Sequence, residues 1–102
     1  MITIHNLRNE QPKEDYDIRV DRQSCLGNPF YMQEETKRDE VCNKYADWFK
    51  IKVGYKEERI YKELERIQEI YERYGKLRLF CWCAPKRCHA ETIRRYLLGE
   101  QI

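Results

Sequence analysis

The residues best suited to chemistry lie together in one segment near the C-terminus, 81–89, with the sequence CWCAPKRCH. The segment contains three of the five cysteines and one of the two histidines of the chain. Thiols and imidazoles are the side chains that most readily bind soft metals or attack electrophiles. The segment therefore predicts a functional site, for which four interpretations are considered.

The first interpretation is a zinc site, because Cys81, Cys83, Cys88 and His89 are ligand types of four-coordinate zinc. Cys81 and Cys83 share one face of a strand. Adjacent residues at the start of a helix diverge by about 100°, which separates Cys88 from His89. The spacing also differs from that of a standard zinc knuckle, so zinc is kept as an alternative.

The second interpretation is a reactive thiol at Cys88. This cysteine precedes an expected helix, whose dipole lowers the pKa of a cysteine at its N-terminus, and Lys86 and Arg87 add positive charge. His89 would act as the acid or base. A reaction at a glycosidic bond also needs a carboxylate, for which Asp21 is the candidate.

The third interpretation is anion binding without chemistry. The same helix start offers free backbone N–H groups beside Lys86 and Arg87, which suits a phosphate. His89 would then donate to the ligand or cap the loop. In a fourth, purely structural interpretation, Cys81 and Cys83 are small core residues at the end of a buried strand.

The elements that position this segment follow from hydrophobic periodicity. Strands are expected near 2–7, 16–21 and 76–83, and helices over 35–52, 56–74 and 88–98. This β-β-α-α-β-α order predicts one α/β domain over 1–102, with two or three layers and a short, mostly parallel sheet. Ligands of such folds bind beyond the carboxyl ends of the strands. The long helix over 56–74 is a candidate oligomer interface.

Composition narrows the functional classes. The chain has 102 residues, of which 13% are aromatic, and this argues against disorder. A net charge of +2 makes no case for general nucleic-acid binding. No apolar run is long enough for a membrane span, and the N-terminus lacks a signal peptide, so a cytoplasmic protein without a disulfide framework is expected.

The chain resembles an uncharacterised domain family found in bacteriophages and bacteria. The resemblance rests on Asn6 in the first strand, Arg22 after the second, Gly-Asn-Pro-Phe at 27–30, the helix start at 38–41 and the Cys-Trp-Cys-x-Pro-x-x-Cys-His segment. Its last motif is similar to one in Rossmann-like α/β proteins, which implies a Rossmann-like fold here. The chain departs from the family at Asp21, where a glycine is usual, and at Leu26, where an aromatic is common.

These motifs would meet at one rim if the strands are parallel neighbours. Arg22 would offer a bidentate fork to a phosphate, and Asn28 an amide to a base or ribose. The full set of expected ligand contacts is Asn6, Arg8, Arg22, Asn28, Pro29, Trp82, Cys83, Lys86, Arg87, Cys88 and His89.

The leading hypothesis is a protein that binds a small phosphorylated, nucleotide-derived ligand. One such protein would be a phage protein that sequesters a signalling nucleotide of bacterial immunity. The alternatives are a small nucleotide-processing hydrolase or transferase using Cys88, His89 and Asp21, and a zinc-stapled interaction module. No cofactor is expected outside the zinc alternative, and the chain is expected to form homo-oligomers.

Overall fold

A three-stranded sheet carries the fold, and the computed structural model describes all 102 residues. The elements are β1 (Ile2–Asn6), β2 (Asp17–Arg19), the 3-10 turn η1 (Glu35–Lys37), α1 (Arg38–Gly54), α2 (Glu58–Tyr74), β3 (Leu77–Cys81) and α3 (Ala90–Leu97). The predicted β-β-α-α-β-α order is confirmed. The first helix begins three residues later than expected because Glu35–Lys37 form the 3-10 turn.

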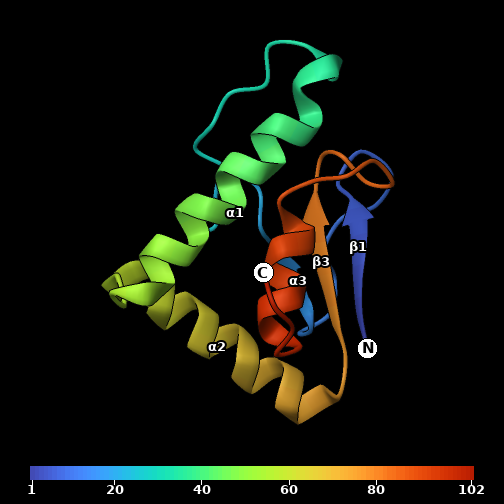
Figure 1. Ribbon diagram of the computed structural model, residues 1–102. Coiled ribbons are helices and arrows are strands. Elements are labelled where there is room, and N and C mark those ends of the chain that lie inside the picture. The colour runs from blue at the N-terminus through green and yellow to red at the C-terminus, as the bar shows by residue number, and fades with distance from the viewer.

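All three strands run parallel, in the order β1-β3-β2. The central strand β3 pairs on both sides, with Leu79 opposite Ile4 of β1 and Ile18 of β2. Its nearly continuous apolar sequence is typical of a strand with two neighbours. Because the strands are parallel, their carboxyl ends lie at one edge of the sheet, shown at the tips of the arrows in Figure 1.

The helices cover one face of the sheet, which makes this a two-layer, Rossmann-like α/β fold rather than a three-layer one (Figure 1). Residues of all three helices join Leu77, Leu79 and Ile18 in a single hydrophobic cluster. On the opposite face Phe80 is fully buried without a helix, because the ring of His5 stacks on it at 5.3 Å and Arg78 covers it.

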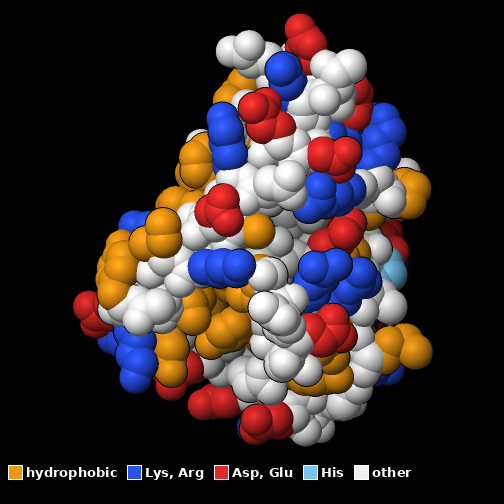
Figure 2. All heavy atoms as spheres, in the orientation of Figure 1, with side chains coloured by type: hydrophobic (Ala, Val, Ile, Leu, Met, Phe, Trp, Pro, Cys, Tyr) orange, Lys and Arg blue, Asp and Glu red, His pale blue; other side chains and the backbone are white.

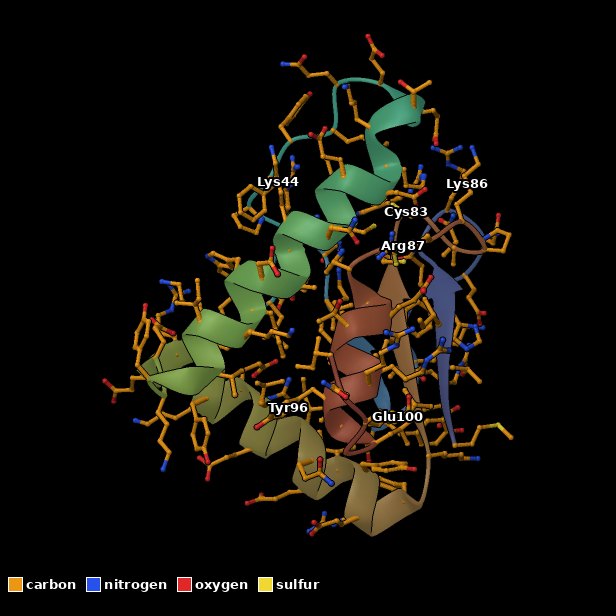
Figure 3. All side chains as sticks on the ribbon, in the orientation of Figure 1. Lys44, Cys83, Lys86, Arg87, Tyr96 and Glu100 are labelled. Atoms are coloured by element: carbon orange, nitrogen blue, oxygen red, sulfur yellow. The ribbon has the colours of Figure 1, made fainter.

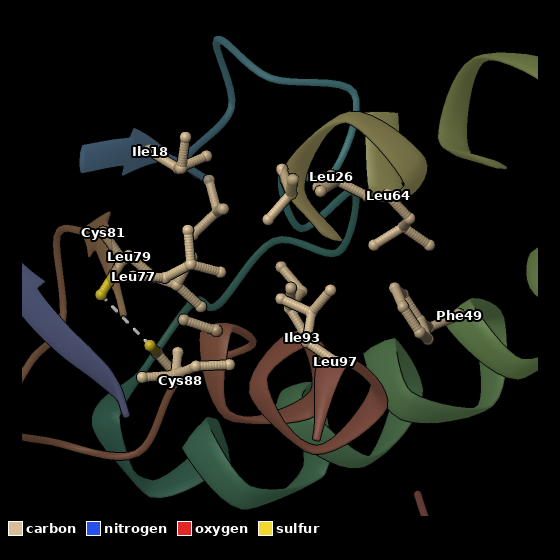
Figure 4. Packing of buried hydrophobic residues seen from close by; sticks show 14 of the residues in the cluster. Ile18, Leu26, Phe49, Leu64, Leu77, Leu79, Cys81, Cys88, Ile93 and Leu97 are labelled. Atoms are coloured by element: carbon tan, nitrogen blue, oxygen red, sulfur yellow. Dashed lines mark hydrogen bonds between the residues drawn. The ribbon is translucent and has the colours of Figure 1, made fainter. Parts of the chain in front are cut away.

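Each helix buries apolar side chains at helical spacing. In α2 the buried residues are Ile60, Leu64 and Ile67, which recur at helical spacing. The helix ends at Gly75, whose φ of +72° is a left-handed conformation that glycine adopts without strain. Figure 4 shows Leu64 of α2 in the core, near Leu26 and Phe49.

Charged side chains are spread over the outer surface (Figure 2). Acidic and basic side chains alternate over the face shown in Figure 2, and hydrophobic ones gather where α1 meets α2. Ile51 and Tyr55, both more than half exposed, lie at this junction. None of the helices has the length and apolar character needed to cross a bilayer.

Candidate functional site

A cavity of about 530 Å³ lies at the carboxyl edge of the sheet. Its walls are the loop after β2, the first turns of α1 and the segment 82–89 that joins β3 to α3. Figure 3 shows Cys83 and Arg87 near the tip of β3, facing α1. The expected ligand contacts that line the cavity are Arg22, Asn28, Trp82, Cys83, Arg87, Cys88 and His89.

The other expected contacts lie outside the cavity. Asn6 is an anchor: its Nδ2 donates to the carbonyls of Trp82 (3.2 Å) and Ala84 (2.8 Å). Its Oδ1 accepts from the backbone N–H of Arg8, so both ends of the amide are used within the protein. Lys86 points to Glu35, with Nζ 3.3 Å from the carboxylate.

The remaining two, Arg8 and Pro29, are exposed and do not line the cavity. Pro29 instead borders a separate shallow depression on the outer side of its loop.

Asp21 lines the cavity, but its carboxylate is already engaged. Arg19 donates to both of its oxygens, and the indole Nε1 of Trp82 donates to Oδ2 at 3.0 Å. Burial alone would raise the pKa of Asp21, but the hydrogen bonds from Arg19 and Trp82 outweigh it and lower the pKa. Asp21 is therefore an ionised group that orients Trp82, and this geometry does not suit the predicted role of catalytic carboxylate.

The thiol of Cys88 contacts another thiol. Its Sγ lies 3.2 Å from Sγ of Cys81, and both cysteines are buried. The hydrogen-bond contact with Cys81 raises the pKa of Cys88, and burial raises it further. The expected lowering of this pKa by the helix dipole, Lys86 and Arg87 is therefore wrong, because the partner thiol and burial are the largest influences on Cys88.

The half-buried Cys83 is the thiol that borders the cavity beside a cation. That cation is Arg38, the first residue of α1, whose pKa is raised by Glu35 and then by Cys83. Arg38 Nη1 also donates to the carbonyl of Arg87 at 2.9 Å, which ties α1 to the segment 82–89. The sequence places Arg38 in the motif that carries the resemblance, but nothing in it identifies this residue as part of the site.

Three guanidinium groups surround the cavity, those of Arg22, Arg38 and Arg87. Arg22 donates to the carbonyls of Asn28 and Phe30, at 3.1 and 3.2 Å, and so holds the Gly-Asn-Pro-Phe loop. Arg87 bonds Asp39 and Asn43 of α1. A guanidinium has five N–H donors, so each group keeps donors that the protein does not use.

His89 is buried at the cavity wall, with only 8% of its surface exposed. Its Nε2 donates to the carbonyl of Val20, and no group of the chain bonds Nδ1. Burial lowers the pKa of His89, which favours the neutral ring with a lone pair on Nδ1.

The candidate zinc ligands do not converge. No three His, Cys, Asp or Glu side chains are placed to hold a metal ion. His89 is turned to Val20, away from the pair formed by Cys81 and Cys88. The physical reason is the divergence of adjacent residues at a helix start.

Aromatic side chains supply the flat surfaces of the cavity. Trp82 is 51% exposed and held by Asp21, while Phe30 and Tyr31 come from the loop after β2. Tyr31 is not predicted by the sequence as a site residue. The guanidinium carbon of Arg22 lies over the Tyr31 ring, 5.2 Å from the ring centre.

Gly27 of the Gly-Asn-Pro-Phe motif is needed because two stretches of backbone approach each other closely. A Cβ at this position would lie 2.5 Å from both Cα of Arg22 and the carbonyl oxygen of Asp21. The absence of a side chain thus brings the loop against the end of β2, where Arg22 can hold it.

A family model described as a domain of unknown function, DUF4326, matches residues 4–99 of the chain. The matched range includes every residue that lines the cavity. Neither a curated protein nor a solved structure shows significant similarity.

Proposed function

The chain belongs to the DUF4326 family, whose domain has no known function, and we propose that it binds a small phosphorylated, nucleotide-type ligand in the cavity at the carboxyl edge of its sheet. The observation that carries the proposal is the placement of three arginines and a half-exposed tryptophan around one cavity. Guanidinium groups recognise phosphate oxygens bidentately, and an indole face stacks on a base.

The size and rigidity of the cavity support the same ligand class. Its 530 Å³ lies within the range of about 300–1,000 Å³ that is usual for small-molecule sites. Trp82 is fixed by Asp21, and the loop beneath it by Asn6, so little ordering is required when a ligand binds. The neighbouring acids Glu35 and Asp39 pair with Arg38 and Arg87, which holds these cations in place.

The direct test measures thermal stability and heats of binding with ADP-ribose, AMP, a cyclic dinucleotide and unphosphorylated adenosine. At least one phosphorylated compound should raise the melting temperature, and adenosine should not. A ligand present at 100 times its Kd stabilises the fold by about 2.7 kcal/mol, which is readily measured. No shift with any phosphorylated nucleotide would contradict the proposal.

Adjacent cations provide a matched pair of variants. Arg87→Ala removes a guanidinium from the cavity and should weaken binding at least tenfold, since bonds to charged groups contribute about 1.5–3 kcal/mol. Lys86→Ala removes a neighbouring charge that pairs with Glu35 outside the cavity, so the affinity should stay within about twofold. Equal losses in the two variants would indicate nonspecific attraction instead of a phosphate site.

A second candidate function is processing of the same ligand by hydrolysis or group transfer. The observation that favours it is the neutral His89 with a free Nδ1 at a cavity that also contains Cys83. Product analysis by chromatography separates the two functions. Binding without turnover is the behaviour of a sequestering protein, whereas turnover that is lost in His89→Gln with retained affinity indicates an enzyme.

A further inference from the structure

Two buried thiols lie within reach of each other behind the cavity. Sγ of Cys81, at the end of β3, and Sγ of Cys88, just before α3, are 3.2 Å apart (Figure 4). Cys81 has no exposed surface, whereas Cys88 retains 4% and lines the cavity. Cys25 has a different environment, since its thiol bonds the carbonyl of Arg59.

We propose that Cys81 and Cys88 form a redox-modification site, in which a reversible disulfide closes the segment 82–87 and changes the cavity. The effect on ligand binding rests on the function proposed above, whereas formation of the disulfide does not. The bond would enclose Trp82, Cys83 and Arg87, which all line the cavity.

A peroxide is small enough to reach Cys88 from the cavity, and hydrogen peroxide balances the reaction. The proton shared by the two sulfurs passes to Cys81, the resulting Cys88 thiolate is oxidised to a sulfenic acid, and the peroxide is reduced to one water molecule. The sulfur of Cys81 then attacks the sulfur of Cys88, an S–S bond forms, and the sulfenic hydroxyl leaves as a second water. Two thiols and one peroxide thus give one disulfide and two waters, and a dithiol reductant reverses the change.

The surroundings of Cys81 favour this second step. The hydrogen-bond contact with Cys88 lowers the pKa of Cys81, and the backbone N–H groups of Cys83 and Ala84 lower it further. A cysteine with a lowered pKa supplies the thiolate that attacks an oxidised partner. Cys81 is therefore suited to resolve an oxidised Cys88.

Forming the bond has a geometric consequence for the cavity. An S–S bond is about 2.05 Å long, so the two sulfurs must approach by about 1.2 Å. The central strand β3 is paired on both sides, so the start of α3 is the part that moves. Arg87 directly precedes this helix start and is bonded to α1 twice. Its carbonyl accepts from Arg38 at 2.9 Å, and its guanidinium donates to Asn43 at 2.9 Å. The movement would stretch both hydrogen bonds.

The test for the bond uses peptide mapping after peroxide treatment and alkylation of free thiols. Trypsin cleaves after Arg78, Lys86 and Arg87, which separates the peptide 79–86 from the peptide beginning at Cys88. A cross-link between them that persists in Cys83→Ser and disappears with dithiothreitol assigns it to Cys81 and Cys88. Absence of the cross-link, or its loss in Cys83→Ser, overturns the proposal; Cys42→Ser is the control that should retain it.

The consequence for the cavity is tested separately, in a Trp48→Phe background where Trp82 is the only tryptophan. Peroxide should shift its emission reversibly in this protein but not when Cys88→Ser is added. ADP-ribose affinity should also fall at least fivefold on oxidation. Unchanged emission with an intact cross-link overturns the effect on the cavity. If ADP-ribose fails to bind even the reduced protein, the proposed ligand is wrong while the cross-link and emission still decide the redox site.

Discussion

Two buried polar residues lie beside the cavity. Asp21 and His89 are the chain's two buried polar residues, and both line the cavity at the end of β2. Each is satisfied there, Asp21 by Arg19 and Trp82, and His89 by the carbonyl of Val20. Buried polar groups are costly unless they are bonded, so this arrangement fixes the positions of Trp82 and the start of α3.

His89 gives a pH-dependent stability whose direction follows from its burial. Its folded pKa is lowered below the unfolded value near 6.5, so the unfolded state binds more protons in the window just below that value. The stability that the neutral His89 contributes should therefore be fully present above about pH 7. The free energy of unfolding should fall as the pH drops through about 6.5, by up to about 1.4 kcal/mol per pH unit. Urea unfolding at pH 7.5 and 5.5 measures this change.

Two histidine variants identify the group responsible for this pH dependence. His89→Gln keeps a donor for the carbonyl of Val20 without a group that titrates in this range, and should flatten the dependence. His5→Gln alters the histidine of β1 on the opposite face of the sheet and should leave it intact. A dependence that survives in His89→Gln would show that another group titrates.

At the scale of elements, the segment 82–89 is held from three sides. Asn6 of β1 bonds its first carbonyls, Arg38 of α1 bonds the carbonyl of Arg87, and Cys88 lies against Cys81 of β3. The site is thus assembled by elements that are distant in the sequence, and each contact contributes to the position of the loop rather than to the ligand directly.

Asn6→Ala tests whether this residue anchors the loop. The substitution leaves the carbonyls of Trp82 and Ala84 without their partner and should lower the free energy of unfolding by about 1–3 kcal/mol. Asn9→Ala changes an exposed asparagine whose side chain bonds nothing and should stay within about 0.5 kcal/mol. Equal stability of the two variants in urea unfolding would show that Asn6 does not anchor the loop.

Local periodicity was sufficient to predict the elements and their order, because apolar spacing directly reports which face of each helix or strand is buried. Together with the expectation of parallel neighbouring strands, it predicts that Asp21, Arg22, Asn28 and the loop before Cys88 meet at one rim. It did not predict that Asp21 would be engaged by Arg19 or that Cys88 would meet Cys81. The contact of Cys88 with Cys81 depends on how the loop after β3 folds back, which spacing alone does not determine.

The whole molecule has one hydrophobic core, and the site is built on it. The core cluster contains residues of every strand and α-helix, and one of its members, Cys88, also lines the cavity. A substitution at Cys88 in the cavity wall is therefore also a substitution in the core. The face of α2 that is not buried is charged, as in the pair Glu58–Lys62, so the predicted oligomer interface on this helix would be polar. Native mass spectrometry would measure the subunit number.

Because the site shares this core, we expect the site and the helices to unfold together. In the Trp48→Phe background, emission of Trp82 reports the cavity and far-ultraviolet circular dichroism reports α1–α3. The two urea transitions should have the same midpoint, as in two-state unfolding of a small domain. Leu79→Ala, which opens a space in the fully buried centre of the sheet, should move both midpoints together and lower stability by about 2–5 kcal/mol. An emission change that precedes the loss of helix would show instead that the loop opens as an independent unit, with a stability set by its bonds to Asn6 and Arg38 and not by the core.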